Sequence, residues 1–330
     1  MLDLNDATAI HAADSRRWLE QILKLPQLLE EGWTAASTFE LPASYAQIDR
    51  VVIAGAGDTI EYGALFAALV SAECPVPIHL VADYDLPAFA RQARTLVIAL
   101  SAARAAEETA ALIEQAQARG CQLLALSQAL PVQGYAVIGA LLNIATRLQW
   151  THDFAADLAE AVEITRAWSS AFAAESPVAQ NLAKRQAGQL MGRLVGVYGA
   201  GHLAEVARVW KNRFNVAAKA WAASEAIPMA NYTALLGVDW PADFARQVAP
   251  LFLLSASDQP RNAQRLALTQ RAFMLHGCNT DLIRARGRSP LAQAMSLVLL
   301  GDCMSYYLAL LYGADPAQTD AIAEFHADLF

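Results

Sequence analysis

A short loop, Gly55-Ala-Gly-Asp-Thr59, offers the first chemistry in the chain. A β-branched apolar run, residues 51–53, comes directly before it, and we expect a helix to begin near Glu61. Strand, glycine turn and helix in this order start a parallel α/β unit, and the first N–H groups of such a helix bind anions. Asp58 would repel an anion, so we expect it to cap the helix. The loop therefore predicts an anion site lined by Gly55, Gly57 and Thr59.

A second polar stretch, Ser101 to Thr109, follows a run without charges, residues 95–100, that is typical of a buried strand. Ser101 and Thr109 carry hydroxyls and Arg104 carries a positive charge, so these three are also predicted to bind the ligand. The alanines between them favour a helix over an open loop. Arg104 has two open interpretations, since it pairs with an anion or is a solvated residue in the first turn of a helix.

Three side chains are candidates for acid–base catalysis, namely His202, Lys219 and Tyr232. His202 follows a second glycine turn, residues 199–201, and either contacts a ligand or only donates to a backbone carbonyl. Tyrosine has an unperturbed pKa of about 10, which suits it poorly to proton exchange near neutrality. Two looser sets are also candidates. Glu205, Lys211, Lys219 and Glu225 are candidates for a new polar site, and the alternating Arg284, Arg286 and Arg288 form either an anion site or a solvated loop.

Metal and cofactor chemistry is not indicated. The four cysteines lie far apart and form neither a zinc spacing nor a disulfide framework. Gly55-x-Gly57 lacks the third glycine of a dinucleotide fingerprint, and no Ser–His–Asp arrangement stands out. We therefore expect no metal and no cofactor.

The composition excludes several classes of partner. Net charge is −8 and no block of Lys or Arg occurs, so nucleic acid and anionic membranes are not expected partners. No uninterrupted apolar run reaches the ~20 residues that span a bilayer. Residues 1–14 carry acids and no signal-peptide pattern. Together with the unpaired cysteines, these features lead us to expect a cytoplasmic protein.

The elements that position these residues alternate between short apolar strands and longer helices, which indicates an α/β fold with open, doubly wound parallel sheets. Two halves, residues 1–150 and 151–330, begin with similar strand–turn–helix stretches. We expect a helix from Ser15 that ends at Gly32, and another that opens at Ser176. The longest helix is expected at 290–312, with Gly313 as its stop. The expected strands are 51–55, 78–82, 95–100, 122–126, 193–198, 251–254 and 280–283. The other expected helices are 102–119, 134–150, 154–173, 202–215 and 317–329.

The pattern resembles the archaeal and bacterial bifunctional phosphoglucose/phosphomannose isomerases, which are built from two sugar isomerase (SIS) domains. The resemblance covers nearly the whole chain and implies two helix-rich SIS-type domains and a homodimer. The stretches that carry it are Val51 to Gly57, Asp83-Tyr-Asp-Leu-Pro87, Ser101, Glu107-Glu-Thr109, Tyr198-Gly-Ala-Gly201, Trp210-Lys211, Phe214-Asn215, Lys219, Leu300-Gly-Asp302 and Tyr307 to Pro316.

The chain departs from that family where the resemblance implies phosphate binding. The family's first loop is richer in glycine and carries a serine where this chain has Thr59. The middle hydroxyls of its second loop are alanines here. After residue 127 the chain is too short for the family's further helix and strand, so its catalytic arginine has no counterpart, and the nearest position is Leu130.

It also departs where the resemblance implies proton transfer. Aldose–ketose isomerisation needs a carboxylate base over two adjacent carbons. The family's glutamate base is Val216 here, its ring-opening histidine is Tyr232, and the lysine of its last helix aligns with His326. The leading hypothesis is a divergent family member without isomerase activity that binds a sugar phosphate or another small anion. The alternative is an active isomerase whose catalytic groups have moved to Tyr232, Lys219 or His202.

Overall fold

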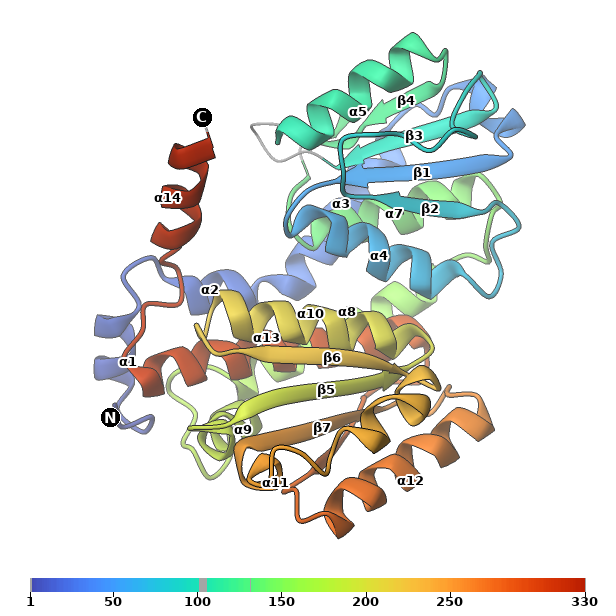
Figure 1. The fold of residues 1–330 in the computed structure, drawn as a ribbon. Coiled ribbons are helices and arrows are strands. Elements are labelled where there is room, and N and C mark those ends of the chain that lie inside the picture. The colour runs from blue at the N-terminus through green and yellow to red at the C-terminus, as the bar shows by residue number, and fades with distance from the viewer. Residues whose placement is uncertain (1, 101–105, 131, 330) are drawn as a thin grey trace. The chain divides into compact units, whose positions relative to one another are not determined.

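The computed structural model describes residues 2–100, 106–130 and 132–329. It contains two compact units (Figure 1). Residues 25–162 form one, here called the β1–β4 unit. Residues 1–24 and 163–330 form the other, here called the β5–β8 unit. The chain thus enters the β1–β4 unit after residue 24 and leaves it after residue 162, whereas the sequence suggested one division near residue 150.

The β1–β4 unit is built on a four-stranded parallel sheet with the order β2-β1-β3-β4. Its strands are β1 (Arg50–Gly55), β2 (Ile78–Val81), β3 (Thr95–Leu100) and β4 (Gln122–Ala125). Every residue of β3 is buried, as expected for a strand covered on both faces. After β4 the chain forms the short helix α6 (Leu126–Ala129) and then α7 (Ala136–Arg147), so no fifth strand is present among the described residues of this unit.

Helices cover both faces of this sheet (Figure 1). Alternate residues of a strand point to opposite faces. Val52 and Ala54 of β1 pack with Leu112 of α5 (Glu107–Ala118), whereas Ile53 packs against α4 (Thr59–Val70). The helix expected from residue 102 begins at Glu107 among the described residues. Residues 102–105 lie outside the part of the chain that the structure describes.

The predicted helix end at Gly32 is wrong. The chain instead forms α2 (Trp18–Leu23) and, after one residue, α3 (Leu25–Thr38), which continues past Gly32. A Cβ at Gly32 would lie 1.8 Å from the carbonyl oxygen of Ala136 in α7. This glycine therefore permits close helix packing, a role that depends on a residue about a hundred positions away in the sequence.

The β5–β8 unit contains a second four-stranded parallel sheet, with the order β6-β5-β7-β8. Its strands are β5 (Leu194–Ala200), β6 (Ala222–Ile227), β7 (Val248–Leu254) and β8 (Asp281–Arg284). Its main helices are α9 (Leu182–Leu190), α10 (His202–Val216), α12 (Pro260–Leu275) and α13 (Pro290–Tyr312). The sequence predicted neither β6 nor α12. The start predicted at Ser176 is wrong, because α9 begins at Leu182 and Asn181 caps it by accepting from the Lys184 N–H.

Helix α13 is the core of this unit. Both of its predicted ends are confirmed: the Ser289 hydroxyl caps its start and Gly313 ends it in the left-handed conformation. By length and composition this helix could cross a membrane, but 94% of its most apolar window is buried inside the structure. That burial is what the core helix of a soluble protein shows.

The remaining helices are short or peripheral. Helix α8 (Ala155–Ala171) leads from one unit into the other, and α14 (Asp320–Leu329) has no buried residue. The others are α1 (Ala7–Ala13), α11 (Phe244–Gln247) and the 3-10 helices Ala43–Gln47, Met229–Tyr232 and Ala234–Leu236.

Candidate functional site

The predicted anion site lies at the carboxyl ends of β1 and β3. The strand order reverses between these two strands, and ligands of open α/β sheets bind at such switch points. Gly55 pairs with Leu100 in the register, so β1 and β3 end side by side. Ser101 and Arg104 lie outside the described residues. Thr109 is buried in the first turn of α5, with 1% of its surface exposed.

The turn after β1 is held closed by its own side chain. The Thr59 hydroxyl donates to the carbonyl oxygen of Ala56 at 2.7 Å and accepts from the Ala56 N–H at 3.1 Å. A hydroxyl has one proton to donate. In this conformation Thr59 therefore has no second proton for a phosphate oxygen. The Thr59 and Glu61 N–H groups at the start of α4 also donate within the turn, to the carbonyl oxygens of Ala56 and Asp58 at 3.2 and 3.1 Å.

The charges on this turn are unfavourable for an anion. Asp58 is at the N-cap position of α4, but its side chain makes no capping hydrogen bond, so the expected capping bond is absent. Glu61 lies in the first turn of the same helix and is buried, with 3% of its surface exposed. Apart from the tyrosine, the ionisable side chains of residues 55–62 are Asp58 and Glu61, and both are carboxylates. They oppose the attraction of the helix N-terminus for a phosphate dianion.

In the second sheet, His202 lies at the carboxyl ends of the strands. This residue is the first of α10 and follows Gly201, whose φ of 52° and ψ of −132° suit only glycine. The Nε2 atom of His202 is buried and has no hydrogen-bond partner in the described structure. Burial lowers the pKa of the imidazole to about 4, so the ring is neutral at pH 7. The expected alternative, a bond to a backbone carbonyl, is not made by Nε2.

The loop after β7, at the same edge, is occupied by an internal side chain. Gln293 of α13 is fully buried, and its Oε1 accepts from the Ser255 hydroxyl and the Ala256 N–H. Its Nε2 donates to the Ser257 hydroxyl and to two backbone carbonyls. The polar groups of this loop are therefore satisfied within the protein, an arrangement that no sequence pattern indicated.

The three candidate catalytic residues do not meet at one edge of the second sheet. Lys219 lies before β6, while Tyr232 follows β6 and His202 follows the parallel neighbour β5. Six residues of strand span about 20 Å, so Lys219 is at the opposite edge. The Tyr232 ring is 66% exposed and contacts the guanidinium of Arg265, whose carbon lies 5.9 Å from the ring centroid.

The residue at the position of the family's base has no acid–base function. Val216 ends α10, and its side chain is 41% exposed and purely aliphatic. Three members of the first looser set make local contacts as well, since Glu205 pairs with Arg208 at 2.7 Å, Lys211 with Asn212 at 3.0 Å and Glu225 with Thr233 at 2.8 Å. Within the described residues, no group of three or more His, Cys, Asp or Glu could hold a metal ion.

Several motifs that suggested the resemblance have structural roles instead. The Trp210 indole N–H donates to the Leu297 carbonyl of α13 at 2.7 Å, and Arg213 pairs with the buried Asp302 at 3.0 Å. The Asn215 side chain accepts from the Ala222 N–H at the start of β6. These motifs thus fix α10 against α13 and β6.

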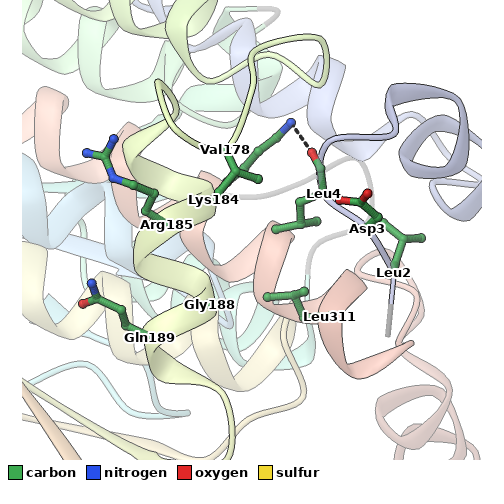
Figure 2. Close-up of a pocket in the computed structure, with 9 residues that line it drawn as sticks. All are labelled: Leu2, Asp3, Leu4, Val178, Lys184, Arg185, Gly188, Gln189 and Leu311. Atoms are coloured by element: carbon green, nitrogen blue, oxygen red, sulfur yellow. Dashed lines mark hydrogen bonds between the residues drawn. The ribbon is translucent and has the colours of Figure 1, made fainter.

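A pocket of about 610 Å³ is lined by the N-terminal segment, α9 and Leu311 (Figure 2). Its lysine, Lys184, is 1% exposed and donates to the carbonyl oxygens of Leu4, Ala174 and Ser176 at 2.7, 2.7 and 2.8 Å. All three protons of the ammonium group are therefore in use. Lys184 anchors the N-terminal segment, and burial lowers its pKa.

The sequence of this chain is similar to those of known isomerases. A bifunctional phosphoglucose/phosphomannose isomerase from Caldicellulosiruptor bescii is 28% identical, over 92% of this chain and 96% of that protein. The chain is a homologue of these isomerases. Another from Thermoplasma volcanium is 25% identical over 88% of this chain and 95% of that protein. Residues 179–329 match the model of the C-terminal SIS domain of bacterial phosphoglucose isomerase.

Solved structures confirm the SIS fold of this phosphoglucose/phosphomannose isomerase homologue. A glucose-6-phosphate isomerase like protein from Thermus thermophilus superposes with a TM-score of 0.63 at 20% identity, over 96% of this chain and 95% of that one. Tagatose-6-phosphate ketose/aldose isomerase from Escherichia coli gives 0.67 at 13% identity, over 93% and 97%. At these identities the likeness concerns the fold alone.

Proposed function

We propose that this SIS protein binds a sugar phosphate or another small anion at the carboxyl ends of β1 and β3 and has no aldose–ketose isomerase activity. The lack of isomerase activity is argued from one observation, the valine at position 216. Isomerisation moves a proton between adjacent carbons and needs a base there. At the position where the resemblance implies a carboxylate, this chain carries an aliphatic side chain that neither accepts nor donates a proton.

We expect this anion site to bind its ligand more weakly than the loops of the relatives imply. Gly55 and Gly57 keep the turn compact, and the start of α4 offers the positive end of the helix dipole to an anion. Against this stand the carboxylates of Asp58 and Glu61 and the closed hydroxyl of Thr59. The predicted ligand residues Ser101 and Arg104 would have to supply the compensating donors, together with Thr109.

The second candidate function is an active isomerase with relocated groups. His202 and Tyr232 favour it, because they follow neighbouring parallel strands and so share one edge of the sheet. The imidazole of His202 is neutral at pH 7, but burial lowers its pKa to about 4, which makes it a weak general base at that pH. The exposed position of Tyr232 and the separation of Lys219 argue against a shared site.

A coupled assay separates the two candidates. Fructose 6-phosphate is supplied, glucose 6-phosphate is detected, and the Caldicellulosiruptor bescii relative serves as the positive control. We expect no turnover above background. Turnover that disappears in Tyr232→Phe or Lys219→Ala, but persists in the matched exposed-tyrosine control Tyr84→Phe, would overturn the proposal that the protein is inactive.

Binding is tested by thermal unfolding of the full chain with sugar phosphates, nucleotide sugars and inorganic phosphate. A ligand in large excess over its Kd stabilises the folded state by a few kcal/mol. We expect a shift with a sugar phosphate, reduced in Arg104→Gln. The absence of a shift with every compound would leave a structural or partner-binding role for the domain.

We further propose a cytoplasmic homodimer. Helix α14 has no buried residue, yet it presents Ile322, Phe325 and Leu329, which are 49, 62 and 55% exposed. A helix with an apolar side normally buries it against another surface. Light scattering after size exclusion should give twice the chain mass, and a mass of one chain at micromolar concentration would contradict the dimer.

A further inference from the structure

A second pocket in the β5–β8 unit, of about 330 Å³, lies away from the sheet edge discussed above. It is lined by the turns that precede β5 and β6 and by the end of α13, so it opens at the amino ends of these parallel strands. The side chains that give it chemical character are Arg193, Lys219, Trp221 and Tyr312.

Two cations face this pocket without a carboxylate among its lining residues. Lys219 Nζ donates to the carbonyl oxygens of Val216 at 2.7 Å and Pro316 at 3.4 Å, which leaves one of its three N–H groups for a ligand. Arg193 is half-buried, and the described structure gives its guanidinium no ion pair. Asp315 and Asp320 act on Lys219 from a distance but do not line the pocket.

The pocket also holds two aromatic rings. The Trp221 indole is 62% exposed and the Tyr312 ring 41% exposed, which is unusual for such large apolar side chains. The Tyr312 hydroxyl accepts from the Gly192 N–H at 2.8 Å, which fixes the position of the ring and leaves the phenolic proton available. Lys219 is also held at a φ of 54°, a left-handed conformation that few lysines adopt.

We propose that this pocket binds a small organic phosphate that carries a flat ring, with the chemistry of a nucleoside monophosphate. The phosphate pairs with Arg193 and with the remaining N–H of Lys219, because charge-assisted bonds from these cations suit phosphate oxygens. The flat ring stacks on the Trp221 indole, as bases do on exposed aromatic side chains. The volume suits a small ligand. This site is separate from the sugar-phosphate site proposed at β1 and β3, and neither depends on the other.

Titration calorimetry of the full chain with AMP tests the proposal, with adenosine, inorganic phosphate and glucose 6-phosphate as comparison ligands. We expect one AMP per chain and weaker binding of each of the other three, because each lacks the phosphate or the flat ring. Trp221→Ala should weaken AMP binding between about fivefold and 150-fold, the range of base stacking. Arg193→Gln should weaken both AMP and phosphate.

The matched control is Trp240→Ala, which removes another exposed tryptophan, 78% exposed and outside the pocket. It should leave AMP affinity unchanged. The proposal is overturned if AMP does not bind, if inorganic phosphate binds as tightly as AMP, or if the two tryptophan variants behave alike. AMP binding that is lost in Thr59→Val and kept in Trp221→Ala would instead assign the nucleotide to the turn after β1.

Discussion

The two sheets begin with the same local pattern, but only one of them packs its helix tightly on a strand glycine. The turn after β1 contains Gly57, with a φ of 58°, and the turn after β5 contains Gly201, with a φ of 52°, and a Cβ at either would meet no atom within 4 Å. Within β5, however, a Cβ at Gly199 would lie 2.2 Å from the Leu203 carbonyl oxygen of α10, whereas at Gly55 of β1 the nearest atom is the Thr59 hydroxyl at 2.9 Å. The two turn glycines are required by backbone conformation, and Gly199 is required by close packing. A glycine turn between a strand and a helix is therefore not, by itself, a sign of a bound ligand.

The largest effect is expected from Gly199→Ala. The added methyl group meets backbone atoms, which cannot rotate away, so α10 must shift relative to β5. We expect a loss of about 3 kcal/mol in the free energy of unfolding, at the upper end for overpacking. Urea denaturation measures it. The control is Gly188→Ala in α9, where a Cβ meets nothing within 4 Å and where alanine should stabilise the helix by about 0.5–1 kcal/mol. Equal effects of both substitutions would remove the packing argument.

A smaller effect is expected from His202, the residue that distinguishes the second turn. Its folded pKa is about 4, below the unfolded value of 6.5. Between these values the unfolded state binds more protons, so stability is complete above pH 6.5 and falls as the pH drops towards 4. The loss should be about 2 kcal/mol, after allowance for the partial exposure of the ring.

This pH dependence is measured as the difference between wild type and His202→Gln at pH 7 and pH 4.5. Carboxylates titrate in both proteins and cancel in that difference. The variant should lose less stability on acidification than wild type does. Parallel pH profiles would show that the imidazole titrates freely and is not desolvated in the folded state.

Most of the fold was predictable because local sequence determines it. Strand β3 was predicted residue for residue from an apolar run without charges, and α13 from its long apolar run and its Gly313 stop. Strand β6 was missed because it lies at the sheet edge and reads Ala-Ala-Ser-Glu-Ala-Ile, with polar residues in its middle. Gly32 was misread because its role is set by Ala136 in another helix.

The candidate site was predictable only as positions, not as contacts. The sequence predicts that the turn after β1 and the stretch from Ser101 bind one ligand, and the structure adds that β1 and β3, which precede them, end side by side. It does not show that Thr59 donates its proton to Ala56, or that Lys219 and Tyr232 lie at opposite ends of β6. Such facts depend on three-dimensional neighbours that spacing does not encode.

A loss of stability smaller than that expected for His202 is expected from Gly57→Ala, which tests the conformational role of the turn after β1. Alanine in a left-handed conformation costs about 1–2 kcal/mol, and here no steric clash adds to it. Gly57→Asn should recover part of the loss, because asparagine tolerates positive φ better than other residues. Thermal and urea unfolding measure both variants. A loss from alanine as large as that of Gly199→Ala would mean that conformation at Gly57 constrains the chain as strongly as close packing does at Gly199.

The smallest effect, and the one that bears most on ligand binding, is expected from Thr59→Val. The substitution keeps the shape and removes the hydroxyl that closes the turn on Ala56, so unfolding should become easier by about 1 kcal/mol. Thr59→Ser keeps the hydroxyl and should restore stability. If the hydroxyl only holds the turn so that the α4 amides face an anion, sugar-phosphate affinity should fall a few-fold in the valine variant alongside stability. A loss of affinity with unchanged stability would instead mean that Thr59 turns its proton from Ala56 to the phosphate when the ligand binds, and that the closed turn is the unliganded state of a working anion site.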